Sequence, residues 1–473
     1  MRTVPPREAL TGACLGCLLA LALPAVVLAA SDGRPNIVLV VADDLGAETM
    51  GAYGGESYPT PHLDALAEEG IRFDHAHSQP LGTPSRVVLL TGQHAFRHRD
   101  GETAPANTIA NYLGAAGYRT AVAGKWVDED SRFDGYRSVS PGEAGFDDFL
   151  VWHLGPGGRE SRYWAPVLDH NGETTRHGED AFGPDVIQGF VLQWIAARAD
   201  EPFFLYYPMV LPHSPWVTTP DMTEEAADEQ RRFAAMVAYM DTLLGEMIDA
   251  LESSATARPT VVLFTSDNGT ERDIVSTYRG AQMAGGKART ATLGTRVPLI
   301  AWGPGIVTGG GVSDSLVDQS DILPTVLELA RIERPVGQSV DGMSLVPVLA
   351  GGAELSRDSL FVHYEPSWPT GRPTRYAFDR RWKFYEDGRF YDMQADPGER
   401  RPLARRGLDR EAFTAYRALE ARVADMPGEL PEDGRWLPPL PIVLFLAALL
   451  FIGLVFRAGF RLLNRLDGEE IRK

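Results

Sequence analysis

Cysteine is almost absent from this chain. The two cysteines among 473 residues, Cys14 and Cys17, both lie in an apolar N-terminal stretch. Arginines precede that stretch and Val27-Leu28-Ala29 has the spacing of a cleavage site, so we expect residues 1–30 to be a cleaved signal peptide. An uncleaved anchor is the alternative. The cleaved chain would have no disulfide, and no thiol for catalysis or metal binding.

Positive charge is also scarce. Lys and Arg total 45 against 64 Asp and Glu, which gives a formal net charge of -19. This excess argues against binding to nucleic acid or to anionic lipid. Anionic esters remain acceptable ligands, because a locally basic cleft can lie inside an acidic protein. Hydrophobic residues at 44% and charged residues at 23% are near globular norms, so extensive disorder is not expected.

Long apolar runs occur only at the two ends of the chain. As a helix, the run at 437–456 would reach about 30 Å, the thickness of a bilayer core. A basic tail, 457–473, follows it and is expected in the cytoplasm. We therefore expect an exported, membrane-anchored protein whose large domain lies on the extracytoplasmic side, periplasmic or at the cell surface. Prolines at the start of the run favour the alternative, a sorting signal that is later removed.

Strand and helix patterns alternate between these ends. The unbroken apolar run at 37–42 is typical of a buried parallel strand. Further strands are expected at 118–123, 203–209, 261–265 and 297–302, and helices at 60–70, 83–92, 108–116, 186–197 and 233–251. The alternation predicts an α/β domain over 31–359, with a mainly parallel central sheet covered by helices on both faces. Short strands, a hairpin signal at Glu386-Asp387-Gly388 and a terminal helix predict a smaller α+β domain over 360–436.

Polar side chains gather where the expected strands end. They are Asp43, Asp44, Lys125, His213, Asp267 and Asn268, and Lys287 lies in a glycine-rich stretch before the last strand. Ligands of open α/β sheets bind at the carboxyl ends of strands, so we expect these groups on one rim. Each motif alone is commonly a turn or a helix cap. Together, three carboxylates and an amide are oxygen donors that suit calcium or magnesium.

The segment Gln79-Pro80-Leu81-Gly82-Thr83-Pro84-Ser85-Arg86 predicts a helix N-terminus. Thr83 is a good N-cap and Pro84 a good first helical residue. Gly82 would then lie just ahead of backbone N–H groups that favour an anion, with Arg86 in the first turn. The segment therefore offers a place for a charged ester group.

Several segments, in order and spacing, resemble the sulfatase family. They are Ala42-Asp43-Asp44-Leu45-Gly46, Thr83-Pro84-Ser85-Arg86 followed by Leu90-Thr91-Gly92, Gly124-Lys125-Trp126, Pro212-His213, Asp267-Asn268-Gly269, Arg296-Val297-Pro298, and the tail segment Tyr391-Asp392 through Asp396-Pro397-Gly398-Glu399. The resemblance runs from about residue 34 to about residue 347, besides the tail. It implies the alkaline-phosphatase-like fold and hydrolysis of sulfate esters, in an anionic small molecule or a sulfated glycan.

The resemblance also implies roles for individual residues. The residues that would bind calcium, with magnesium the less favoured ion, are Asp43, Asp44, Asp267 and Asn268. Those that would hold the sulfate oxygens or protonate the leaving alcohol are Arg86, Lys125, His213 and Lys287. Cationic groups stabilise such a transition state when they lie where negative charge develops.

Two positions depart from the family pattern. The family has cysteine or serine where this chain has Gly82, and oxidises it to formylglycine, whose hydrate attacks sulfur. Glycine has no side chain to be oxidised. Val127 stands where the family commonly has a histidine.

Three interpretations stay open from the sequence. The first is a hydrolase in which metal-bound water attacks a sulfate, phosphate or phosphonate ester. The second is a non-catalytic protein that binds a sulfated or phosphorylated ligand. In the third, the metal serves only to stabilise the fold. The sequence carries no signal for an oligomeric state.

Overall fold

The structure is a computed structural model that describes residues 33–98, 108–126, 139–152, 160–198, 201–222, 228–253, 258–335, 337–364 and 373–426. The expected signal peptide, the expected membrane helix with its tail, and Val127 lie outside these ranges. Inside them, no helix combines the length and the apolar character needed to cross a membrane.

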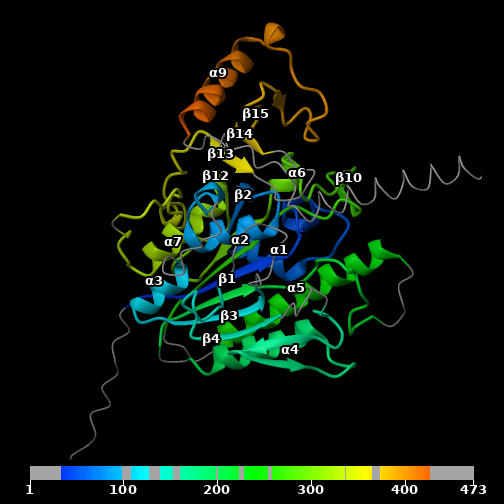
Figure 1. Ribbon diagram of the computed structural model, residues 1–473, viewed down its shortest axis with the longest axis vertical. Coiled ribbons are helices and arrows are strands. Elements are labelled where there is room, and N and C mark those ends of the chain that lie inside the picture. The colour runs from blue at the N-terminus through cyan, green and yellow to red at the C-terminus, as the bar shows by residue number, and fades with distance from the viewer. Residues whose placement is uncertain are drawn as a thin grey trace, which may run out of the picture. The chain divides into compact units, whose positions relative to one another are not determined.

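A ten-stranded sheet forms the centre of the described chain (Figure 1). Its strands, in spatial order, are β12 (Gly311–Asp318), β2 (Ile71–His77), β11 (Leu299–Trp302), β8 (Thr260–Ser266), β1 (Asn36–Ala42), β7 (Phe203–Pro208), β3 (Arg119–Lys125), β4 (Asp148–Trp152), β5 (Val167–His170) and β6 (Glu173–Arg176). Strands β8, β1, β7, β3 and β4 run parallel, as does the pair β12 and β2.

The sheet is mixed, which corrects the expectation of a mainly parallel one. Strand β11 is antiparallel to both of its neighbours, and β5 and β6 join antiparallel beyond β4. After β8 the chain stays at the carboxyl edge of the sheet through the loop that carries Asp267 and Lys287. Strand β11 therefore starts at that edge and must run back, a direction that apolar periodicity does not encode.

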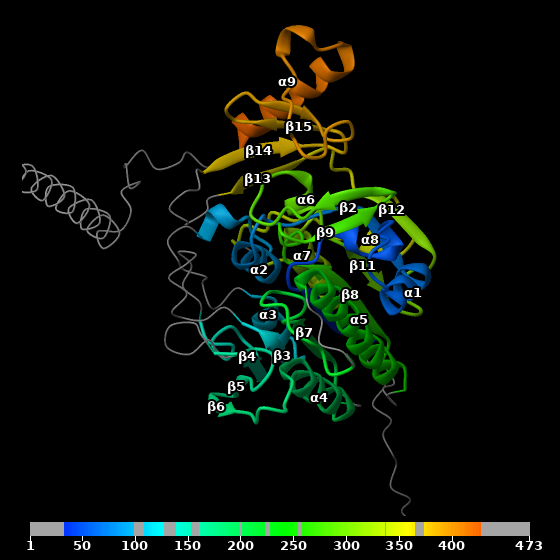
Figure 2. The same cartoon turned by 90° about the vertical axis from the view of Figure 1, so that its right-hand side faces the viewer.

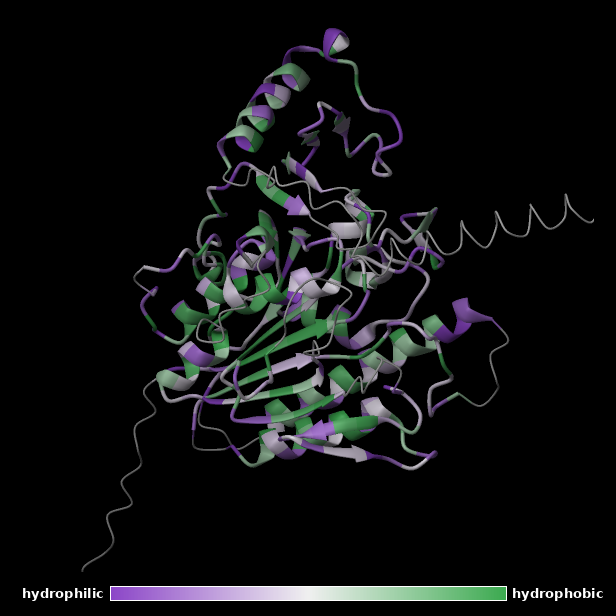
Figure 3. Ribbon diagram, in the orientation of Figure 1, coloured by the Kyte–Doolittle hydropathy of each residue, from purple (hydrophilic) through white to green (hydrophobic). Residues whose placement is uncertain are grey.

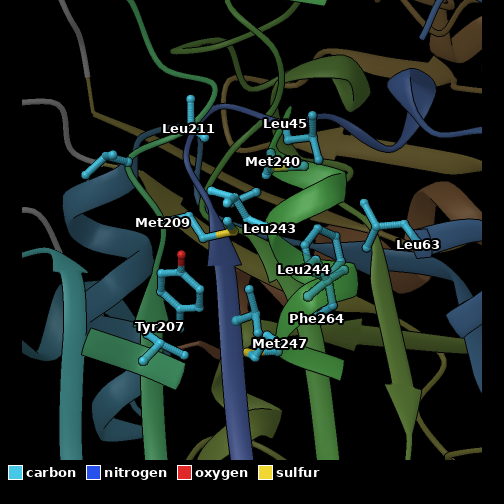
Figure 4. Close-up of a cluster of buried hydrophobic side chains, with 14 of the residues drawn as sticks. Leu45, Leu63, Tyr207, Met209, Leu211, Met240, Leu243, Leu244, Met247 and Phe264 are labelled. Atoms are coloured by element: carbon cyan, nitrogen blue, oxygen red, sulfur yellow. The ribbon is translucent and has the colours of Figure 1, made fainter. Parts of the chain in front are cut away.

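Strand β1 explains why both faces of the sheet are covered. All seven of its residues are buried, and successive side chains point to opposite faces. Val38 and Val40 share one apolar cluster with α1 (Pro61–Glu69), α4 (Gly183–Ala196) and α5 (Glu229–Ser253). Figure 4 shows part of this cluster, with methionines and leucines of α5 beside Tyr207 and Phe264.

The other face of β1 belongs to a second cluster. Ile37, Leu39 and Val41 pack there with α2 (Gly82–Thr91), α3 (Ile109–Ala115), α7 (Ile322–Leu329) and the short α8 (Val346–Leu349). Figure 2 shows the helices on the two sides of the sheet, and Figure 3 shows hydrophobic colour concentrated on its central strands. The predicted two-sided covering is confirmed.

Helix α2 begins two residues earlier than predicted. Its first residue is Gly82 and its N-cap is Leu81, which makes no side-chain capping bond, so Thr83 is not the cap. Proline is tolerated in the first helical turn because those N–H groups have no intrahelical partner. Pro84 therefore indicates the first turn without identifying its first residue.

A second, four-stranded antiparallel sheet follows in the chain. Its strands are β13 (Leu360–Tyr364), β14 (Thr374–Phe378), β15 (Trp382–Tyr385) and β16 (Phe390–Asp392). The predicted hairpin corresponds to β15 and β16, and the predicted terminal helix to α9 (Arg410–Asp425). Tyr416 of α9 packs its ring edge-on against Phe384 and Phe390, so the helix covers one face of this smaller α+β unit.

The remaining elements are short. They are β9 (Val275–Tyr278), β10 (Ala281–Ala284), α6 (Thr292–Thr295), and the 3-10 turns η1 (Ala47–Thr49), η2 (Gly51–Tyr53), η3 (Ala95–His98), η5 (Gln319–Asp321) and η6 (Arg405–Gly407). Strands β9 and β10 form a hairpin inside the loop between β8 and β11.

Candidate functional site

The carboxyl ends of the central strands bring the predicted acidic residues to one rim. Asp43 and Asp44 directly follow β1, and Asp267 and Asn268 directly follow β8. The two strands are parallel and paired through their last residues. The four side chains are therefore neighbours, although Asp44 and Asp267 are 223 positions apart in the sequence.

Hydrogen bonds hold this acidic group in one arrangement. The backbone N–H of Asp44 donates to Oδ1 of Asp267 at 3.0 Å, and Nδ2 of Asn268 donates to Oδ1 of Asp44 at 2.8 Å. Asp44 has a φ of 71°, in the left-handed region that aspartate tolerates better than most residues. All are buried together with Asp43, and buried carboxylates need compensating positive charge.

Lys125 and Arg86 supply part of that charge. Nζ of Lys125, the last residue of β3, lies 2.6 Å and 2.8 Å from the two carboxylate oxygens of Asp43. Nη2 of Arg86, in α2, lies 2.8 Å from Oδ2 of Asp267 and 3.6 Å from Oδ1 of Asp43. Burial raises the pKa of Asp43, but the charges led by Lys125 outweigh it and lower that pKa to about 2.

Lys287 and His213 lie on the other side of the acidic group. Nζ of Lys287 is 2.6 Å from Oδ2 of Asp44 and 3.0 Å from Oε2 of Glu271. Burial lowers the pKa of the Lys287 ammonium, but these carboxylates outweigh it and raise the pKa above its ordinary value. Nδ1 of His213 donates to the carbonyl of Ser214 at 2.5 Å, so the neutral ring leaves Nε2 as an acceptor, 3.3 Å from Lys287 Nζ. Burial lowers the pKa of His213, which favours that neutral ring.

Gly82 stands at the start of α2, facing the same group. A Cβ built on it would lie far inside van der Waals contact with Oδ2 of Asp267, and 3.4 Å from Oδ1 of Asn268. Arg86 lies one helical turn further along α2. The two atoms Nε and Nη1 of its buried guanidinium have no hydrogen-bond partner among the described residues. Unused donors of a buried cation are what an anionic group would bind.

The donor set fits a hard divalent cation. Oδ1 of Asn268 is buried and, in the part of the chain that the structure describes, has no hydrogen-bond partner. One ligand atom each from Asp43, Asp44 and His213 lie within 4.8 Å of one another. Carboxylate and amide oxygens are the ligands that calcium and magnesium prefer. The acidic cluster could therefore hold a metal, and the structure brings all four predicted ligands together.

Two residues of the rim were not predicted. Glu271 follows the Asp267-Asn268-Gly269 segment by two residues, so its proximity to Lys287 could have been considered from the sequence. Arg162 lies in a stretch without any recognised motif, yet its Nη1 is 3.4 Å from Oδ2 of Asp43. No sequence signal marks that arginine.

The C-terminal sheet holds the loop that carries Lys287. The buried ammonium of Lys383, in β15, donates to the carbonyl of Thr290 and lies 2.8 Å from Oε1 of Glu399. The hydroxyl of Tyr385 lies 2.9 Å from Oγ1 of Thr290 and bonds Glu399 as well. The tail segment that contains Glu399 thus contacts the main site through a loop.

Comparisons with known proteins found families and relatives that this chain resembles. Residues 35–332 match the sulfatase family, and residues 292–420 match the family described as N-sulphoglucosamine sulphohydrolase, C-terminal. The chain is 32% identical over 383 residues to arylsulfatase A of Homo sapiens, which covers 71% of each protein. It is 30% identical over 359 residues to N-acetylgalactosamine-6-sulfatase of Homo sapiens, covering 68% of this chain and 67% of that protein.

Solved structures share this fold. One, in complex with its substrate D-glucosamine-2-N,6-O-disulfate, has a TM-score of 0.64 at 21% identity and covers 82% of this chain and 97% of that chain. The mixed central sheet and the smaller C-terminal sheet both fall within the matched regions. This chain belongs to the sulfatase family.

Proposed function

We propose that the rim of the central sheet binds the sulfate ester of a glycan or a small anionic molecule beside a calcium ion. The observation that carries this proposal is the convergence of three buried carboxylates, a buried amide oxygen that has no hydrogen-bond partner among the described residues, and three cations. Of these cations Arg86 is buried, and Lys125 and Lys287 are partly buried. Such a set has no packing role that apolar residues would not fill better. The relatives named for sulfated substrates support the ester class.

The proposed roles follow from charge and position. Asp43, Asp44, Asp267 and Asn268 would hold the calcium, with magnesium as the less favoured ion. Calcium in this place would supply Lewis-acid polarisation of an ester oxygen and neutralise its charge. The cations Arg86, Lys125 and Lys287 would bind the remaining sulfate oxygens. His213, whose neutral ring leaves Nε2 without a proton, would accept a hydrogen bond from the ligand or a proton from an attacking water.

Gly82 lacks the side chain from which formylglycine is made, and this absence restricts the reactions that the site can perform. Because the chain has no cysteine after Cys17 and glycine has no side chain, we propose that the natural protein does not run the formylglycine reaction. It would then act as a binding protein for a sulfated or phosphorylated ligand. A second candidate is hydrolysis of a sulfate, phosphate or phosphonate ester by water, favoured by the neutral His213, whose unprotonated Nε2 can accept a proton.

The location of the protein is a separate proposal. We propose export and anchoring through residues 437–456, with the sheet on the extracytoplasmic side. Support comes from the apolar length of that segment and the arginines after it. Protease treatment of cells that express the full chain, with the outer envelope opened and the cytoplasmic membrane intact, should remove the large domain, and protection of that domain would contradict the proposal.

Turnover of an aryl sulfate tests the function directly. The purified full-length protein is assayed with calcium, beside Gly82→Cys co-expressed with the enzyme that makes formylglycine. We expect turnover only from Gly82→Cys, because its side chain restores a nucleophile beside the proposed metal ligands and cations. Calorimetry on the natural protein should show calcium binding and, with calcium present, binding of inorganic sulfate.

The outcomes separate the candidates. Turnover by the natural protein that Asp267→Ala abolishes would establish the water-based reaction. A natural protein that binds neither calcium nor sulfate, together with an inactive Gly82→Cys, would contradict the proposed site.

A further inference from the structure

Arg162 is an arginine that the family resemblance does not assign and that reaches the centre of the site. Its Nη1 lies 3.4 Å from Oδ2 of Asp43, and its side chain is only 12% exposed. The guanidinium carbon lies 3.9 Å from the ring centroid of Trp152, so the planar group stacks on the indole. Stacking holds the plane of a guanidinium and leaves its edge donors free for an anion.

The surrounding contacts fix Arg162 in this place. Trp152 is the last residue of β4 and pairs in register with Lys125 at the end of β3, which puts both on the rim. Nε1 of Trp152 donates to the carbonyl of Glu160 at 3.1 Å. The hydroxyl of the next residue, Tyr163, donates to the carbonyl of Val210 at 2.8 Å. The segment that carries Arg162 is thus tied to β4 and to the stretch that follows β7.

Three cations share the carboxylate of Asp43. Besides Arg162 at 3.4 Å, it faces Lys125 at 2.6 Å and Arg86 at 3.6 Å. A divalent cation bound to this carboxylate would compete with all three. Arg162 lies farther from Asp43 than Lys125 does, and its guanidinium stacks on Trp152. It can therefore leave the carboxylate while the indole still supports the plane of the guanidinium.

We propose that Arg162 is an anion-binding residue of this site, which pairs with Asp43 in the absence of metal and with an oxygen of the ester once a divalent cation occupies that carboxylate. The inference rests on the proposed function, since it needs both the cation and the anion. It makes the binding of the two ligands cooperative, because the metal frees the donor that the anion uses.

The proposal predicts effects of opposite sign in one variant. Arg162→Gln removes a competitor of the metal, so calcium should bind more tightly in the absence of anion. The same change removes a charge-assisted hydrogen bond to the anion, so inorganic sulfate should bind the calcium-loaded protein about tenfold more weakly. An arginine that only stabilises the fold around Asp43 would weaken both.

Arg198→Gln is the matched control. Arg198 also stacks on a tryptophan, with its guanidinium carbon 4.7 Å from the Trp194 ring centroid, and Nη2 lies 2.8 Å from Oδ2 of Asp148. Asp148 begins β4 whereas Trp152 ends it, so this arginine lies at the opposite edge of the sheet. Removing it takes away the same charge and the same kind of contact far from the rim.

The experiment is calorimetric titration of the full-length natural protein and its variants, first with calcium alone and then with inorganic sulfate in excess calcium. Arg162→Gln should show tighter calcium and weaker sulfate binding, while Arg198→Gln should match the natural protein in both. Arg162→Lys retains a charge beside Asp43 if the glutamine variant fails to fold. Without the planar fork, the lysine should still bind sulfate more weakly than arginine.

Other results overturn the inference. Unchanged sulfate affinity in Arg162→Gln or Arg162→Lys would remove Arg162 from the anion site. Weaker binding of both ligands in Arg162→Gln would make it a structural residue. If the natural protein itself binds neither ligand, the proposed function fails, and the role of Arg162, which rests on it, fails with it.

Discussion

Arg86 and Asp267 form a buried ion pair in the space beside residue 82. Nη2 of Arg86 lies 2.8 Å from Oδ2 of Asp267, and the two side chains are 4% and 0% exposed. A Cβ on residue 82 would collide with that same carboxylate oxygen. The pair in this arrangement and a side chain at position 82 therefore exclude each other.

Gly82→Ala should destabilise the metal-free protein. The new methyl group would push the buried carboxylate of Asp267 off Arg86, and loss of a hydrogen bond between charged groups costs about 1.5–3 kcal/mol. Gly189→Ala is the matched control, because Gly189 lies inside α4 with open space where its Cβ would be. That control should gain up to about 1 kcal/mol from helix propensity. Denaturant unfolding in chelator measures both, and a Gly82→Ala protein as stable as the control would contradict the collision.

Calcium should raise the unfolding temperature of the natural protein after chelation. A ligand at about 100 times its dissociation constant adds about 2.7 kcal/mol to the stability of the folded state. Asp44→Asn should lose this increase, whereas Asp387→Asn, the same exchange on the exposed β15–β16 turn, should retain it. Thermal scans with chelator, calcium and magnesium check the prediction. An equal increase in the natural protein and Asp44→Asn would exclude Asp44 as a ligand.

Arg357→Gln should destabilise the fold far more than an exposed arginine does. Nη1 and Nη2 of Arg357 lie 2.7 Å and 2.6 Å from the two oxygens of Asp321, whose side chain is 0% exposed. Breaking a buried pair from one side costs about 3–5 kcal/mol, since the other charge stays buried. Arg417→Gln breaks the exposed pair with Glu420 and should cost about 0–1 kcal/mol. Similar unfolding free energies for the two variants in denaturant would refute the prediction.

Glu48→Gln should stabilise the protein more at pH 8 than at pH 5. Burial raises the pKa of Glu48, although the Thr270 hydroxyl, which donates to Oε1 at 2.6 Å, opposes the shift. A group with a raised folded-state pKa contributes stability below its unfolded pKa and loses it as pH rises through the folded value. The natural protein therefore bears a buried carboxylate at pH 8, which glutamine avoids while it still accepts from Thr270. Unfolding temperatures at both pH values test this, and an equal gain at each would contradict it.

The sequence predicted which side chains meet at the rim better than it predicted how the strands pair. Strand-end positions placed Asp43 beside Asp267, and both strands that precede them were expected from their apolar residues. Strands β2 and β12 escaped notice because their polar residues interrupt the apolar pattern, as Arg72 and Asp74 do in β2. The first residue of α2 was also misplaced, because a proline fits any position of the first turn.

The sequence by itself determined the sulfatase family, the alternation of buried strands and helices, the absence of cysteine after Cys17, and the lack of a side chain at position 82. These depend on local composition and on the order of motifs. Only the tertiary structure decided that β11 runs antiparallel, that Arg162 reaches Asp43 from a stretch with no motif, and that Lys383 contacts the loop of Lys287. Such contacts join residues from 34 to 230 positions apart, and their geometry depends on how the strands pair in space, which residue order alone does not state.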